Sequence, residues 1–156
     1  MIYSILKTLH VLAIVLWLGG MMFAHWFLRP AVHRLEPSQR LALMLDVLTR
    51  FFKAVLVSSL LVLITGYWML GRVAKQAAQT GLSFEVPISW WVMAVLGTLM
   101  VAIFLHIRFA LFRRFRDAVQ FATLDKAAKT LGSIRFWVGV NLALGVLIVV
   151  VVLLGS

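Results

Sequence analysis

The sequence has 156 residues with a net charge of +10, 63% of them are hydrophobic, and the mean hydropathy is +1.05. Soluble domains are about 45–50% apolar, so this composition excludes a soluble globular protein and indicates an integral membrane protein. The absence of cysteine excludes disulfides, thiolate metal sites and c-type haem attachment. Because membrane topology explains the basic charge, we expect no nucleic-acid partner.

Four long apolar segments predict an all-α membrane protein, a single four-helix bundle over residues 1–156 that is embedded in the lipid bilayer. The predicted spans are about 2–28, 54–70, 88–111 and 134–154. A helix of about 20 apolar residues crosses the hydrocarbon core, and none of these segments alternates like a barrel strand. Lys7 is the only charge before the first span, and no small-residue cleavage site ends it. We therefore expect this span to stay in the protein as a helix.

Local signals predict where these helices end. Arg29-Pro30 is expected to stop the first helix, and Pro37-Ser38 is typical of a helix start that would lengthen the second. The stretch from Gly71 to Pro87 is predicted to connect the second and third helices. Gly132-Ser133 is predicted to break the chain before the last one. Segment 110–131 has helical charge patterning and is expected to extend the third helix along or below the inner membrane surface.

The basic residues predict the orientation of the bundle. Twelve of the fifteen lie in or beside the connections after the first and third spans: Arg29, Arg34, Arg40, Arg50, Lys53, Arg108, Arg113, Arg114, Arg116, Lys126, Lys129 and Arg135. Only Lys7, Arg72 and Lys75 lie on the other side. The positive-inside rule therefore places both rich connections in the cytoplasm and both termini outside.

Three histidines lie within predicted spans, where a polar side chain marks a functional site by default. At 1.5 Å per residue, His10 lies about 10 Å below the outer surface, whereas His106 and His25 lie about 27 and 33 Å below it. A single metal ion cannot join groups so far apart in depth. The sequence therefore predicts an outer site at His10 and a separate inner pair, His25 with His106.

Met93 of the third span matches His10 in depth, and two cofactors suit this pair. A His/Met pair is an established haem ligand set, and Trp17, on the same helix face as His10, could flank a planar haem b. Thioether beside imidazole equally suits Cu(I). In the copper interpretation Met21, Met22, His25 and His106 form a soft relay toward the inner face, with His10 as a further ligand.

Each of these residues also has a structural interpretation. Methionine commonly fills gaps in cores, and a histidine near a span end is often only hydrogen-bonded. Asn141 is expected to form a hydrogen bond between helices, and the glycines in the spans, such as Gly66 and Gly145, are expected to allow close helix packing. A non-catalytic assembly subunit therefore stays open as a third interpretation beside haem and copper.

Four motifs carry a resemblance to a known family. They are LKTLHVLAIVLWLGGMMF at 6–23, ITGYWML at 64–70, LMVAIFLHIRF at 99–109 and IRFWVGVNLALG at 134–145. Together they resemble the CopD (copper resistance protein D) family. The first is also similar to the HemJ family of protoporphyrinogen oxidases, in which Leu-His followed by Trp and Gly opens a four-helix bundle.

The resemblance implies a multi-pass protein of the bacterial inner membrane. It implies either copper handling or a b-type haem role in electron transfer or redox chemistry, with His10 matching the first-helix histidine of the family. HemJ-like proteins pair that histidine with a lysine early in helix three, where this sequence has WWVMAVLG and Met93 is nearest. This difference argues against protoporphyrinogen oxidase activity. We also expect a redox or periplasmic partner, and a homodimer.

Overall fold

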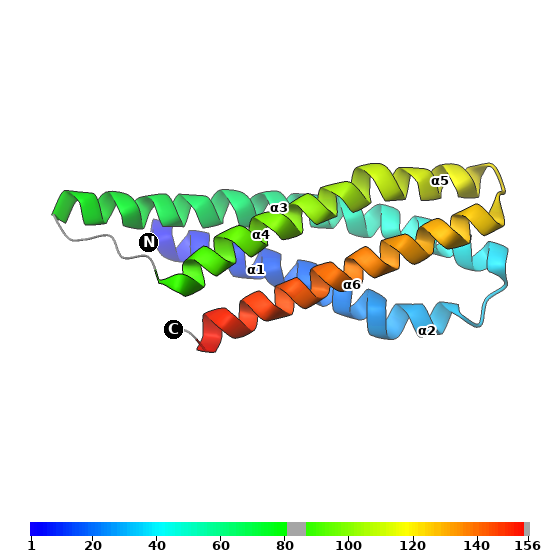
Figure 1. Ribbon diagram of the computed structural model, residues 1–156, viewed down its shortest axis with the longest axis horizontal. Coiled ribbons are helices and arrows are strands. Elements are labelled where there is room, and N and C mark those ends of the chain that lie inside the picture. Colours follow the sequence, from blue (N-terminus) through cyan, green and yellow to red (C-terminus); the bar gives the residue numbers. More distant parts are fainter. Residues whose placement is uncertain (81–86, 155–156) are drawn as a thin grey trace.

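The computed structural model describes residues 1–80 and 87–154, and these residues form helices joined by short turns, without a strand. Four helical runs lie alongside one another (Figure 1). The first run comprises α1 (Ile2–Phe23), the π-helical turn η1 (Ala24–Leu28) and α2 (Arg29–Val32), and the second is α3 (Pro37–Thr80). The third comprises α4 (Ile88–His106), the π-helical turn η2 (Ile107–Leu111) and α5 (Phe112–Gln120), and the fourth is α6 (Leu124–Leu154). The predicted all-α architecture is confirmed.

Each run is long and apolar enough to cross a membrane. Large apolar side chains cover the outside of the bundle; Leu12, Val57, Ile64 and Val95 each expose more than half of their surface. Such exposure would be costly in water, whereas lipid tails cover it without cost. The protein is therefore a multi-pass membrane protein whose helices contact the bilayer.

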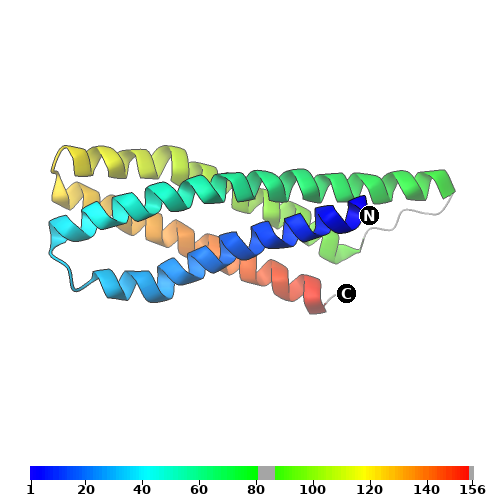
Figure 2. The ribbon, with the colours of Figure 1, turned by 180° about the vertical axis from the view of Figure 1, so that it is seen from behind.

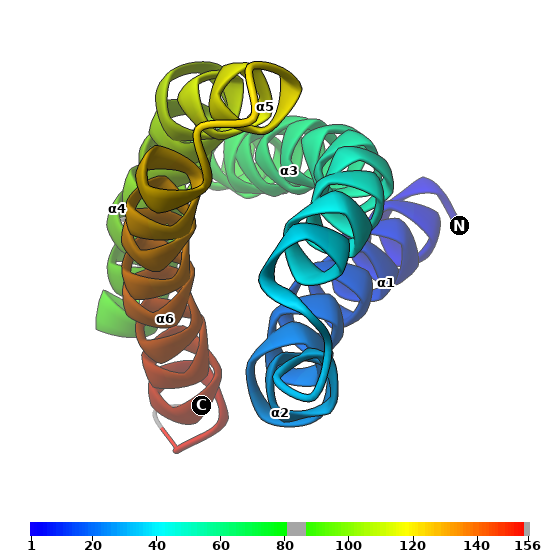
Figure 3. The same cartoon turned by 90° about the vertical axis from the view of Figure 1, so that its right-hand side faces the viewer.

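Both termini lie at one end of the bundle, called here the termini end (Figures 1 and 2). The turns at 33–36 and 121–123 lie at the opposite end, the turn end. The chain order therefore places the twelve basic residues of the two connections in the half of the bundle that carries these turns. Figure 3 looks along the bundle from the turn end and shows α3 between α1 and the run of α4 and α5.

Three predicted helix boundaries are wrong. The first helix continues past Arg29-Pro30 to Val32, because the wider turn of η1 accommodates a proline that cannot donate an α-helical hydrogen bond. Helix α3 continues past Gly71 to Thr80; residues 81–86 of the predicted connection lie outside the described part of the chain. Helix α6 begins at Leu124 rather than after Gly132-Ser133. The predicted helix start at Pro37 is confirmed.

The predicted extension of the third helix is confirmed up to Gln120, after which the chain turns and α6 begins. At this turn Ala122 has a φ of 53°, in the left-handed region that non-glycine residues adopt only with strain.

An aromatic stack fills the centre of the bundle. Trp17 of α1 packs edge-on against Phe104 of α4 at 6.0 Å between ring centroids. Phe104 contacts Phe52 of α3 at 5.9 Å, and Phe52 contacts Phe112 of α5 at 5.2 Å. Such edge-to-face pairs are favourable beyond the area they bury. The stack joins three of the four helical runs and separates the termini end from the turn end.

Close helix packing at glycine is confirmed at two positions in this core. A Cβ atom at Gly20 would lie 2.4 Å from the ring of Phe51, and one at Gly145 would lie 2.9 Å from Leu18. The predicted interhelical hydrogen bond of Asn141 is also confirmed, because its Nδ2 donates to the carbonyl of Met100 at 3.1 Å. Asn141 is only 1% exposed, so this hydrogen bond joins α6 to α4 in the interior of the bundle.

Candidate functional site

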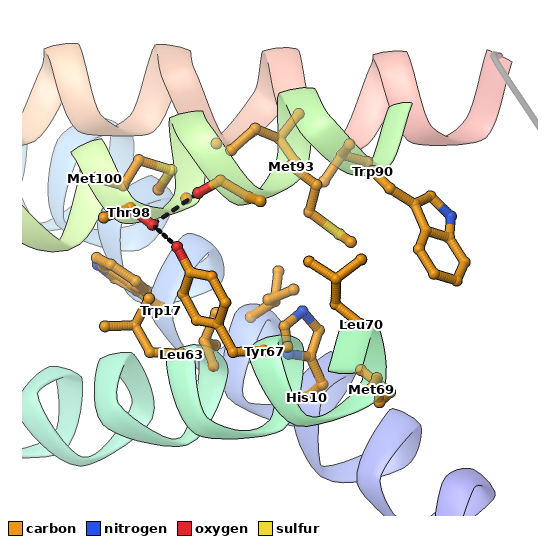
Figure 4. A pocket seen from close by; sticks show the side chains of 18 of the residues that line it. His10, Trp17, Leu63, Tyr67, Met69, Leu70, Trp90, Met93, Thr98 and Met100 are labelled. Atoms are coloured by element: carbon orange, nitrogen blue, oxygen red, sulfur yellow. Dashed lines mark hydrogen bonds between the residues drawn. The ribbon is translucent and has the colours of Figure 1, made fainter. Parts of the chain in front are cut away.

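A partly open cavity of about 130 Å³ lies in the half of the bundle at the termini end (Figure 4). All four helical runs contribute to its wall, which is mainly apolar. Its lining includes His10, Trp17, Gly66, Tyr67, Met93 and Thr98. The aromatic stack begins at Trp17, so it closes the cavity on the side toward the turn end. The cavity therefore has a polar group at His10 within an apolar wall.

His10 belongs to the buried face of α1 that also contains Trp17 and Met21, as the helical spacing predicts. Its side chain is 7% exposed and points into the cavity (Figure 4). Its Nδ1 lies 2.9 Å from Oγ1 of Thr65 on α3. The Thr65 hydroxyl donates its single proton to the carbonyl of Leu61, one turn earlier in the same helix. The Thr65 oxygen must therefore accept a proton from His10.

This arrangement determines the tautomer of His10. With the proton on Nδ1, the lone pair is on Nε2. The Nε2 atom is buried and has no hydrogen-bond partner in the described part of the chain. An unpartnered polar atom is costly in an apolar interior, and a ligand that accepts the lone pair removes that cost. Histidines that bind metals characteristically donate the other ring N–H to a neighbouring group in this way.

Gly66 allows the histidine to sit against α3. A Cβ atom at this position would lie 3.1 Å from Cε1 of His10 and 3.7 Å from Nδ1. Any side chain here would force the imidazole to move by a few tenths of an ångström. The adjacent residues Thr65 and Gly66 thus have complementary effects: the first orients the ring, and the second provides the space for it.

Met93 and Trp17 line the same cavity as His10. Figure 4 shows Met93 pointing into it from α4, across from His10. Nearby, the Tyr67 hydroxyl of α3 lies 2.8 Å from Oγ1 of Thr98 on α4. Because Thr98 donates to the carbonyl of Ala94, the tyrosine is the donor. This bond links the two helices beside the cavity, and the structure brings together His10, Met93 and Trp17 as one candidate site.

The other predicted site residues lie elsewhere. His25 is half-buried, with its Cε1 4.0 Å from a Cβ position at Gly139, whereas the exposed His106 packs edge-on against Trp137 at 6.0 Å. Residues 137 and 139 point about 200° apart around α6, at 100° per residue. The two histidines therefore contact opposite faces of α6, and the structure does not bring them together.

The two remaining candidate ligands belong to the packing of the bundle. Met21 is 2% exposed and lies in the hydrophobic core, and Met22 packs against that core. The described residues contain no group of three or more His, Cys, Asp or Glu side chains that could hold a metal ion. A metal in this protein would therefore need thioether ligands or a low coordination number.

Sequence reasoning missed Thr98, which accepts the hydrogen bond from Tyr67 beside the cavity. It also missed Thr65, the hydrogen-bond partner of His10. Thr65 sits in the ITGYWML motif as a small polar residue within an apolar span, and that position is the signal that could have found it. Hydroxyl side chains in spans commonly bond back to their own helix, as Ser58 does to Ala54. Only the neighbouring helix reveals that Thr65 has a second partner.

The copper resistance protein D family profile matches residues 45–154, more than half of the chain. The chain belongs to the copper resistance protein D family. The match covers α4 to α6 and most of α3, and therefore the Thr65, Gly66 and Met93 side of the cavity; α1 with His10 precedes it. No curated protein and no solved structure matches the chain.

The dimensions of the cavity distinguish the two ligands considered for this CopD protein. Organic cofactors occupy pockets of roughly 300–1,000 Å³, and a water molecule takes about 30 Å³. At about 130 Å³, the cavity is smaller than such pockets and accommodates a metal ion with a few waters more readily than a haem. Imidazole and thioether are donors that suit Cu(I). The residues present therefore fit copper better than haem b.

Proposed function

We propose that this protein binds copper as Cu(I) inside the membrane, with Nε2 of His10 and the thioether of Met93 as its protein ligands. The observation that supports this most strongly is the buried Nε2 of His10, which has no hydrogen-bond partner among the described residues and whose lone pair is directed by the bond between Nδ1 and Thr65. Family membership independently connects the chain to copper resistance.

The position of the cavity supports entry of the ion from the termini end. The cavity lies in that half of the bundle, and the stack of Trp17, Phe104 and Phe52 separates it from the turn end. The positive-inside rule assigns the termini end to the periplasmic side of a bacterial inner membrane. We therefore propose that the protein receives copper from that side, as the substrate of a copper-handling system rather than as a redox cofactor.

Competition with a chromophoric Cu(I) chelator tests this function on protein reconstituted in lipid nanodiscs. The wild type is expected to take up one Cu(I) per chain. His10→Ala is expected to bind at least about 100-fold more weakly, since it loses a ligand itself rather than a residue that orients a ligand. Met93→Leu is expected to show a smaller loss.

The matched controls are His33→Ala in the exposed turn at 33–36, and Met22→Leu. Both are expected to bind like the wild type. Equal Cu(I) affinity in His10→Ala and the wild type would contradict the proposal. A Soret band in the purified wild type that His10→Ala removes would instead support the haem b interpretation.

A further inference from the structure

The helices of the bundle pack as two pairs. Helix α1 packs mainly against α3, and α4 packs mainly against α6. Figure 3 shows α1 beside α3 and α4 beside α6. The hydrogen bond between His10 and Thr65 lies within the first pair. The hydrogen bond from Asn141 to Met100 lies within the second pair. The two proposed copper ligands therefore belong to different pairs, His10 to the first and Met93 to the second.

Two contacts join the pairs beside the cavity. At the closed end of the cavity, Trp17 of the first pair packs against Phe104 of the second. Closer to the termini end, the hydroxyl of Tyr67 on α3 donates to Oγ1 of Thr98 on α4 at 2.8 Å. Thr98 precedes Phe104 by six residues, so this hydrogen bond lies about 9 Å farther from the turn end than the stack. Figure 4 shows Tyr67 reaching from α3 to Thr98 beside the cavity.

Each end of this hydrogen bond is fixed next to a proposed ligand. Tyr67 directly follows the two residues of α3 that orient the His10 ring and provide space for it. Thr98 donates to the carbonyl of Ala94 at 2.7 Å, and Ala94 directly follows Met93 in α4. The hydrogen bond therefore connects the segment of α3 that holds His10 to the segment of α4 that carries Met93.

The surroundings of this hydrogen bond favour its formation in the membrane. Tyr67 is 52% exposed and Thr98 is also exposed, so both contact lipid. Thr98 lies ten residues into α4, about 15 Å from the start of the helix, which is a depth within the hydrocarbon core. Lipid tails offer no group that could replace either partner, and an unpaired hydroxyl is costly there. We therefore expect the two pairs to stay joined at this point.

We propose that the hydrogen bond from Tyr67 to Thr98 sets the separation of His10 and Met93, which makes Tyr67 a positioning residue of the copper site. This role rests on the proposed copper function, whereas the separation itself exists without copper. Binding sites tolerate ligand displacements of only about 0.5 Å. Without the hydrogen bond, the pairs can separate on the open side of the stack, and Met93 moves away from an ion held by His10.

Electron–electron distance measurements on the copper-free protein in lipid nanodiscs test the separation. Because the chain has no cysteine, spin labels can be attached to Val11→Cys beside His10 and to Val95→Cys in α4 without background labelling. Both positions are exposed. Tyr67→Phe is expected to give a longer mean distance and a broader distribution than the parent protein. The matched control Tyr3→Phe, in the first turn of α1, is expected to leave the distribution unchanged.

Competition with a Cu(I) chelator tests the consequence for binding. Tyr67→Phe is expected to bind Cu(I) about tenfold more weakly, as does loss of other residues that position a metal ligand. Thr98→Val is expected to show the same loss and serves in place of Tyr67→Phe if that variant does not fold, whereas Thr98→Ser keeps the acceptor and is expected to retain wild-type affinity. Because Tyr67 acts through Met93, adding Tyr67→Phe to Met93→Leu is expected to cause no further loss.

Unchanged spin-label distances in Tyr67→Phe would overturn the proposal. So would an affinity loss in Tyr67→Phe that adds fully to the loss in Met93→Leu, since Tyr67 would then act independently of Met93. Wild-type Cu(I) affinity in His10→Ala would instead contradict the copper function, and the spin-label distances would still show whether the hydrogen bond sets the separation.

Discussion

The hydrogen bond from His10 to Thr65 can be removed with almost no change in shape, by the substitution Thr65→Val. The hydroxyl oxygen accepts from Nδ1 at 2.9 Å in a buried site, where Thr65 is 3% exposed. Without it, the ring keeps only its hydrogen bond to the backbone of Val62, so the proton moves more easily to Nε2 and the ring rotates more easily. After either change, the lone pair of Nε2 no longer points into the cavity.

The size of the effect follows from the role of Thr65 as a positioning residue. Loss of the partner that orients a metal-binding histidine weakens metal affinity by about 10- to 100-fold, or about 1.4–2.8 kcal/mol. Loss of this hydrogen bond is expected to lower the free energy of unfolding by about 0.5–1.5 kcal/mol as well. Cu(I) competition titration and unfolding in detergent measure these two effects separately.

Two further variants test whether a loss of Cu(I) affinity comes from the changed orientation of His10 or from general destabilisation of the protein. Thr65→Ser keeps the hydroxyl and is expected to retain wild-type Cu(I) affinity. Ser58→Ala removes a buried hydroxyl that bonds back to the carbonyl of Ala54 in its own helix, and it is expected to leave the affinity unchanged. Wild-type affinity in Thr65→Val, or a loss in Thr65→Ser as large as in Thr65→Val, would refute the assigned tautomer.

Three other variants follow from the packing of the bundle. Gly66→Ala is expected to weaken Cu(I) binding by about tenfold in the same titration, because its Cβ would displace His10. The control Gly71→Ala places a Cβ that meets no atom within 4 Å, and it is expected to bind Cu(I) normally. Asn141→Leu loses the bond to α4 and is expected to destabilise the protein by about 0.6–1.7 kcal/mol in detergent unfolding, with an unchanged midpoint contradicting the account. Ala122→Gly relieves a left-handed residue and is expected to raise the free energy of unfolding by about 1 kcal/mol; a decrease would show that this turn is not strained.

The fold could be predicted from the sequence because hydropathy and length leave few alternatives for a span. The helix ends could not, because glycine and proline signals are weak against tertiary packing. Pro30 remains within a helical run because η1 widens around it, and Gly132 lies between the buried residues Leu131 and Ile134 that hold α6 in place.

The depth of each candidate ligand in the membrane could be predicted from the sequence, whereas the helix faces that meet in the folded bundle could not. A fixed rise per residue is enough to match His10 with Met93, and both line one cavity. Depth also matched His25 with His106, yet these two contact opposite faces of α6, since equal depth does not specify which face of a neighbouring helix a side chain meets. The homodimer and the periplasmic or redox partner stay predictions.

Copper K-edge X-ray absorption of the Cu(I)-loaded protein tests the central claim most directly. The account predicts a Cu(I) edge with both nitrogen and sulfur scatterers in the wild type, loss of the sulfur contribution in Met93→Leu, and no bound copper in His10→Ala after chelator washing. A spectrum with only oxygen or nitrogen scatterers that is the same in all three proteins would contradict it.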